Sequence, residues 1–91
     1  MMIQIIENGG RNNMVTLRLI TKTEDCYIYH YFPEDKEKYG VVSINSITGE
    51  WEIIKIAAND EFKRYLMHVL KEITRFYEFN CYLEKSMVTW Y

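Results

Sequence analysis

The residue types best suited to chemistry in this chain are two histidines and two cysteines: His30, His68, Cys26 and Cys81. A zinc site needs three or four such ligands around one ion. Cys26 and His30 share one face of a predicted strand, but four residues of strand separate them by roughly 13 Å. His68 falls one helical turn before Glu72, and an ordinary surface contact explains it. The spacing therefore predicts no metal site and no cofactor.

The two cysteines are also isolated from each other along the chain. Cys26 and Cys81 are 55 positions apart and form no Cys-x-x-Cys motif. A disulfide between them is geometrically open, whereas reduced, buried thiols are the commoner state of such cysteines. We expect reduced, buried thiols without a chemical role.

Nucleophilic catalysis requires a nucleophile, a base and a group that orients the base. Ser43 and Ser46 lie in or beside a predicted hairpin, with no histidine near them in the sequence. The acids of residues 34–38 alternate with lysines, as in a solvated loop. Gly9 and Gly10 precede no predicted helix and so do not form a phosphate-binding loop. The sequence predicts a protein that is not an enzyme.

A set of three tyrosines is the most distinctive surface candidate. Tyr27, Tyr29 and Tyr31 alternate along one predicted strand and therefore share one face of a sheet. Such a face could stack on unpaired bases, but Arg18 and Lys55 are the sheet-face cations expected, and the net charge is −2. Tyrosine also suits a protein interface, because its ring is apolar and its tip is polar.

The elements that position these residues begin with four strand-like segments. They alternate apolar and polar residues or are rich in tyrosine and β-branched residues, and they occupy residues 14–20, 26–32, 39–45 and 51–56. The last two are joined by the strongest hairpin signal, in which Asn45 starts the turn with its side chain and Gly49 supplies a positive φ. This loop pairs apolar residues on one face, Ile44 with Trp51 and Val42 with Ile53.

A long amphipathic helix is predicted over residues 60–78. Asn59 is a suitable N-cap, Asp60 places negative charge at the first turn, and Asn80 can end the helix in a left-handed conformation. Met67 is an apolar exception within the polar arc. The apolar arc is roughly 140° wide and contains Phe62, Tyr65, Leu66, Val69, Leu70, Ile73, Phe76 and Tyr77.

The order of the elements predicts an α+β fold, an antiparallel β-meander of four to five strands with one long C-terminal helix packed across one face. Residues 81–91 form a fifth strand or a docked tail, and a helix that continues through Leu83 is the competing interpretation. The predicted core consists of the inward-facing sets, namely Leu17, Leu19, Ile28, Val42, Ile44, Ile53, Phe62, Leu66, Val69, Ile73 and Phe76.

Length and composition place one domain in residues 14–91. The 91-residue chain is 48% hydrophobic and 15% aromatic, which is ample for a core. Residues 1–13, with Gly9-Gly10 among asparagines, are predicted to be a flexible N-terminal segment or an upstream extension. Met1–Ile6 or the C-terminal tail could instead cover the tyrosine face. The N-terminus resembles no signal peptide, and no apolar run approaches the roughly 18 residues that cross a bilayer. We expect a soluble, cytoplasmic protein.

Three segments carry a resemblance to other proteins: residues 39–50, the helix that follows them, and the ending Met87-Val88-Thr89-Trp90-Tyr91. Together they resemble short uncharacterised bacterial proteins of the sheet-plus-helix type, over residues 14–91. The resemblance implies a bacterial, cytoplasmic protein and transfers no functional residue.

The functional prediction is a small non-catalytic protein–protein interaction domain that self-associates. Its expected partner is a second copy, in a homodimer, or else another protein. The alternative is a binder of single-stranded nucleic acid or of a small ligand through the tyrosine face. The balanced charge disfavours nucleic acid and membranes as partners. The tyrosine face is favoured over Met67 as the interface. The candidate interaction surface comprises Tyr27, Tyr29, Tyr31, Met67, Trp90 and Tyr91.

Overall fold

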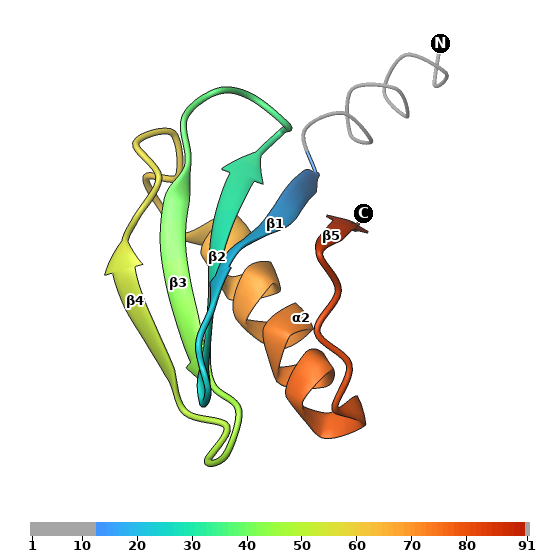
Figure 1. Ribbon diagram of the computed structural model, residues 1–91. Helices are drawn as coiled ribbons and strands as arrows, with labels where there is room; N and C mark the ends of the chain where they lie inside the picture. Colours follow the sequence, from blue (N-terminus) through green and yellow to red (C-terminus); the bar gives the residue numbers. More distant parts are fainter. Residues whose placement is uncertain (1–12, 91) are drawn as a thin grey trace, which may run out of the picture.

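The alternating segments form an antiparallel sheet with one helix against one of its faces (Figure 1). The computed structural model describes residues 13–90. Its elements are β1 (Met14–Lys22), β2 (Cys26–Pro33), β3 (Gly40–Asn45), β4 (Trp51–Lys55), α2 (Arg64–Phe79) and β5 (Lys85–Thr89). The strand order is β4-β3-β2-β1-β5, which confirms the predicted α+β architecture. The predicted N-terminal segment lies outside the described residues, apart from Asn13.

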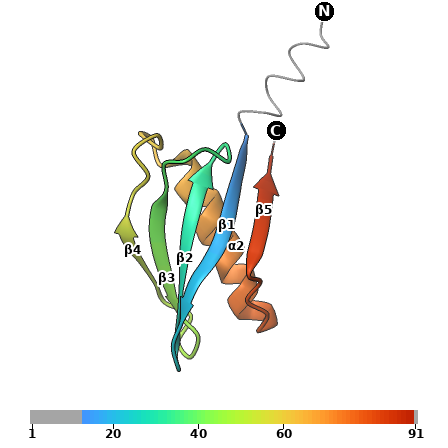
Figure 2. The ribbon, with the colours of Figure 1, turned by 45° about the horizontal axis from the view of Figure 1, so that its top comes forward.

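The C-terminal segment is a strand rather than a continuation of the helix. The helix ends at Phe79, and Asn80 closes it with a φ of 51°, as predicted. β5 then pairs antiparallel with β1, placing Val88 opposite Val15 (Figure 2). The fifth strand is thus confirmed, and the interpretation of a helix through Leu83 is wrong.

The hairpin between β3 and β4 has the predicted register. The Asn45 Oδ1 atom accepts hydrogen bonds from the backbone N–H groups of Ile47 and Thr48, at 2.8 and 3.0 Å. Gly49 has a φ of 82°. Ile44 lies opposite Trp51, and Val42 opposite Ile53.

The tyrosine side of β2 is the side that α2 covers. Tyr29 lies opposite Leu19 of β1 and Val42 of β3, and both Tyr29 and Tyr31 are 0% exposed. The prediction that these tyrosines face outward is therefore wrong. Ile28, a predicted core residue, lies on the opposite face, since strand neighbours alternate between faces.

Gly40 is required by this packing. A Cβ atom at Gly40 would lie 2.1 Å from the Tyr31 ring, which rests directly over the backbone of β3. Only glycine leaves room for the buried ring, so a single position without a side chain allows the large tyrosine into the core.

The helix buries most of the predicted arc but begins later than predicted. Its buried residues are Tyr65, Leu66, Val69, Leu70, Ile73 and Phe76. Residues 60–63 form turns instead of a first helical turn, with Lys63 at a φ of 58°. Phe62 is consequently 83% exposed and is not a core residue. Asn59 is not the cap, because the Asp60 carboxylate accepts the N–H groups of Tyr65 and Leu66.

The helix does not cover the whole sheet. It packs mainly on β1, β2 and β5, so the far strand β4 keeps all five residues exposed. Ile53, predicted for the core, is 39% exposed. Within residues 13–90, no helix combines the length and apolar character needed to cross a membrane.

Candidate functional site

The predicted interaction surface is divided by the fold into buried and exposed parts. Tyr27 is half-buried and stacks on Tyr82, with ring centroids 3.9 Å apart, while its two neighbours on the strand face are in the core. The tyrosine face is therefore wrong as an open surface for a protein, a nucleic acid or a small ligand. Trp90 is half-buried and stacks on His68, with ring centroids 3.7 Å apart. Tyr91 lies outside the described residues.

Met67 is the member of that set that stays open to solvent. Its exposed fraction is 58%, as its place in the polar arc predicted. Across from it, the helix-facing side chains of β4 are also uncovered, with Trp51 45% and Ile53 39% exposed. We call Trp51, Ile53 and Met67 the β4 surface.

A groove connects the two halves of the β4 surface. It has a volume of about 520 Å³ and runs between Trp51 on the sheet and Met67 and Leu70 on the helix. The charged residues Lys71, Arg75 and Glu78 also line it. An apolar floor with a charged rim is the usual arrangement of a protein-binding surface.

The backbone of β4 is open along the same side. The Asn45 N–H donates to the Glu50 carbonyl at 2.8 Å, which sets the alternation of hydrogen bonds along the hairpin. In an antiparallel pair, residues that do not bond the partner strand direct their N–H and C=O groups outward. Trp51 and Ile53 occupy these positions, so their backbone groups lie at the free edge of the described sheet.

The edge strand also contains a β-bulge. Val42 pairs with Ile53, but Val41 pairs with Lys55, so Ile54 is an extra residue without a partner on β3. Bulges are common on sheet edges and redirect the side chains that follow them. Here the bulge turns Lys55 to the sheet face away from α2, and Ile54 is 53% exposed.

A second group of polar residues lies at the start of the helix, and its bonds are internal. The Tyr31 hydroxyl donates to Asp60 Oδ2 at 3.2 Å and accepts the Ala57 N–H at 3.0 Å. Burial raises the pKa of Tyr31 to about 12. Asp60 also accepts the helix amides of Tyr65 and Leu66 described above. The carboxylate therefore joins β2 to the helix, which is a structural role.

A neighbouring phenol–carboxylate pair extends this network to the surface. The Tyr65 hydroxyl donates to Glu34 Oε2 at 2.6 Å. This bond lowers the pKa of Glu34, while burial and then the Glu34 carboxylate raise the pKa of Tyr65 to about 12.

The histidines are held by aromatic rings. His30 stacks on Tyr39 at 4.2 Å between ring centroids, and burial, with a further contribution from Lys55, lowers its pKa. His68 lies against Trp90 rather than making the predicted contact with Glu72. Its pKa is lowered by burial and then by Lys71 and Arg64.

The cysteines differ from the predicted pair of buried thiols. Both are free, with Cys26 half-buried and Cys81 exposed. Among residues 13–90, no three His, Cys, Asp or Glu side chains gather closely enough to hold a metal ion.

Sequence reasoning missed the β4 surface because it assigned one face of this strand to the core. A signal was present in Trp51-Glu52-Ile53-Ile54-Lys55-Ile56, where large apolar residues are too frequent for one buried face. A strand with apolar residues on both sides needs cover on both sides, and the single long predicted helix covers only one.

The chain has no match among protein-family models, curated proteins or solved structures.

Proposed function

We propose that this protein is a non-catalytic interaction domain that forms a two-fold homodimer by pairing β4 with β4 of a second copy. The observation that carries the proposal is the exposure of every residue of β4, at an edge where no other strand within residues 13–90 pairs with it. Exposed apolar edge strands readily pair with another strand, and proteins normally shield them. Bacterial origin and a cytoplasmic location remain predictions from the sequence.

A second copy is the occupant that the strand itself favours. Antiparallel pairing of two identical strands brings Trp51 of one copy toward Ile53 of the other on the helix side. On the opposite side the same register places Glu52 of one copy opposite Glu52 of the other, so the apolar contacts and the backbone hydrogen bonds have to outweigh one pair of like charges. The Met67 side chains then close the apolar groove from both copies.

The solution mass tests this proposal. Wild-type protein should have twice the 11.0 kDa mass of one chain at high micromolar concentration, by light scattering or sedimentation equilibrium. Ile53→Pro should yield a folded monomer, because it removes an outward N–H and spares the bonds to β3. Trp51→Glu should also yield a monomer.

Phe62→Glu is the matched control, since it places the same charge at an exposed aromatic position outside the β4 surface. This variant should remain a dimer, and circular dichroism should show the same helix signal in all three variants. A monomeric wild-type protein, or a dimer that survives both β4 substitutions, would contradict the proposal.

A further inference from the structure

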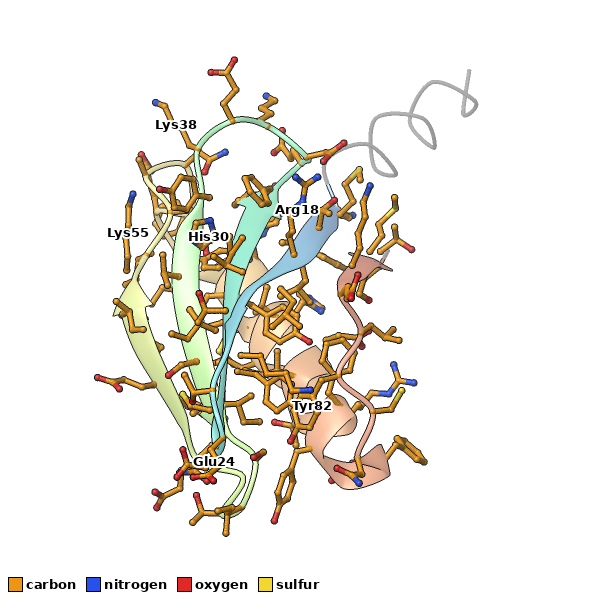
Figure 3. All side chains as sticks on the ribbon, viewed as in Figure 1. Arg18, Glu24, His30, Lys38, Lys55 and Tyr82 are labelled. Atoms are coloured by element: carbon orange, nitrogen blue, oxygen red, sulfur yellow. The ribbon has the colours of Figure 1, made fainter. Side chains whose placement is uncertain are left out.

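The sheet face away from α2 carries three cations, on β5, β1 and β4, in one line of cross-strand neighbours. The strand registers place Lys85 opposite Arg18, Arg18 opposite His30, His30 opposite Val41, and Val41 opposite Lys55. Figure 3 shows Lys55, His30 and Arg18 in this order across the sheet. Four strand spacings make the row about 19 Å long. We call Lys85, Arg18 and Lys55 the cationic row.

Aromatic rings lie beside the cationic row on the same face. His30, Phe32 and Tyr39 form one cluster, in which Tyr39 lies 4.2 Å from His30 and 5.7 Å from Phe32 between ring centroids. The Lys55 Nζ atom lies 4.3 Å from the centroid of Tyr39, and the Arg18 guanidinium 5.9 Å from that of Phe32. All three rings are partly exposed.

No carboxylate within residues 13–90 forms an ion pair with the cationic row. The ion pairs within residues 13–90 join Lys36 to Glu34 and Arg75 to Glu72, on other surfaces. Arg18 and Lys85 are direct cross-strand neighbours, an arrangement that costs stability because like charges repel. Glu52, opposite Ser43, is the acid that the register places on this face of β4.

The bulge in β4 contributes to this arrangement. In a regular strand, Ile54 would lie opposite Val41, and Lys55 would point to the helix side. The extra residue instead brings a lysine onto the open face, next to Tyr39. The bulge thus adds a third positive charge to the face that carries Arg18 and Lys85.

We propose that the open sheet face binds single-stranded nucleic acid, with phosphates on the cationic row and unpaired bases against Phe32 and Tyr39. Cations interleaved with aromatic rings match the alternation of phosphate and base in a single strand. An acidic peptide would satisfy the cations but would leave the rings without planar partners. The lowered pKa of His30 keeps its ring neutral at pH 7, so it adds a flat surface without further repulsion.

The salt dependence of binding gives the first test. Three phosphate contacts predict a slope of about −2 for the logarithm of the binding constant against the logarithm of salt concentration. Fluorescence anisotropy with labelled oligo-dT and oligo-rU should show this slope. A duplex of the same length should bind more weakly, because its bases are already stacked.

Variants then assign the binding to this face. The double variant Arg18→Gln/Lys85→Gln should reduce affinity roughly twenty-fold in 0.1 M salt and lower the slope to about −0.7. Lys63→Gln/Lys71→Gln makes the same charge change on the helix side and should leave binding unchanged. Tyr39→Leu should reduce affinity about tenfold with the slope retained, since it removes a stacking surface and no charge.

These tests are independent of the proposed dimer. Arg18 and Lys85 lie on the two strands farthest from β4, so their double variant should keep the wild-type solution mass. Its thermal midpoint should be at least that of the wild type, because the substitutions remove a pair of like charges. Absence of oligonucleotide binding at low salt would overturn the inference, as would an equal loss in the helix-side control. Full affinity of the Tyr39 variant, or equal competition by polyglutamate or phosphatidylserine vesicles, would reject single strands as the occupant.

Discussion

At the level of single residues, the interior contains a few polar atoms with hydrogen-bond partners. The Tyr31 hydroxyl connects β2 to the segment before the helix through Ala57 and Asp60. These three residues are at most 2% exposed, so water cannot replace a lost bond. In contrast, three buried side-chain oxygens, those of Thr16, Asn59 and Tyr82, have no partner within residues 13–90.

Tyr31→Phe should destabilise the fold by about 1–3 kcal/mol, because it leaves the Ala57 N–H buried without an acceptor. Urea unfolding followed by circular dichroism measures the difference. Tyr27→Phe is the matched control and should be nearly neutral, since the Tyr27 hydroxyl makes no hydrogen bond to described residues. Equal stability of the Tyr31 variant and wild type would show that the network is dispensable.

Thr16→Val should stabilise the fold, in contrast to Tyr31→Phe. The substitution keeps the side-chain shape and removes a buried hydroxyl that has no partner, so the free energy of unfolding should rise by about 1 kcal/mol. The same urea titration detects this gain. A clear loss of stability would indicate that the hydroxyl is bonded in solution.

At the level of elements, α2 is held by packing rather than by its intrinsic ends. Its N-cap position, Lys63, makes no capping bond with its own side chain, and its first turn contains no acidic residue. The buried carboxylate of Asp60 caps the helix from outside it. Val69 and Ile73 are 0% exposed at the centre of the contact with the sheet.

Leu66→Ala or Ile73→Ala should each cost about 2–5 kcal/mol, because each leaves a cavity in a packed core. Phe62→Ala removes a larger apolar side chain from an exposed position and should change stability by less than about 0.5 kcal/mol. Thermal unfolding of the three variants gives the comparison. Unchanged midpoints for Leu66→Ala and Ile73→Ala would contradict the position of the helix.

At the level of the whole molecule, the two proposed surfaces are compatible. Pairing of β4 with a second β4 about an axis normal to the sheet keeps both helices on one side and both open faces on the other. The dimer would therefore present two cationic rows on one continuous surface. Binding of a longer single strand could then engage both copies, which raises affinity without new contacts.

The stability of the whole protein should fall as the pH decreases below about 6.5. The pKa values of His30 and His68 are lowered from 6.5 in the folded state, so the unfolded state binds more protons once the pH falls below that value. Their stabilising contribution is present above pH 6.5 and is lost as the pH falls through the folded-state pKa values. The lowered pKa of Glu34 also makes stability fall with decreasing pH, but only once the pH is below the ordinary glutamate pKa of 4.5.

Thermal midpoints measured from pH 8 to pH 5 check this expectation. His68→Phe retains an aromatic ring against Trp90 and removes one titrating group. The thermal midpoint of this variant should therefore decline less between pH 8 and pH 5 than that of the wild type. A wild-type midpoint that is constant or rises over this range would contradict the assignment.

The sequence alone was sufficient for the local features of this protein. Residues close in the chain establish the alternation of the strands, the Asn45–Gly49 turn and the register of Ile44 with Trp51. The same is true of the apolar arc of the helix and its end at Asn80. These features depend on periods of two and 3.6 residues and on turn chemistry, which a short window of sequence contains.

Contacts between distant parts of the chain determine which face of the sheet is covered and where the helix begins. β2 has large apolar or aromatic residues on both faces, and Gly40 admits Tyr31 beneath the helix, so alternation alone could not choose the side. The helix begins late because Asp60 bonds Tyr31, 29 residues away in the chain. The open β4 edge and the cationic row follow from the placement of α2 and from strand pairing. Both depend on contacts between distant residues, which local patterns do not encode.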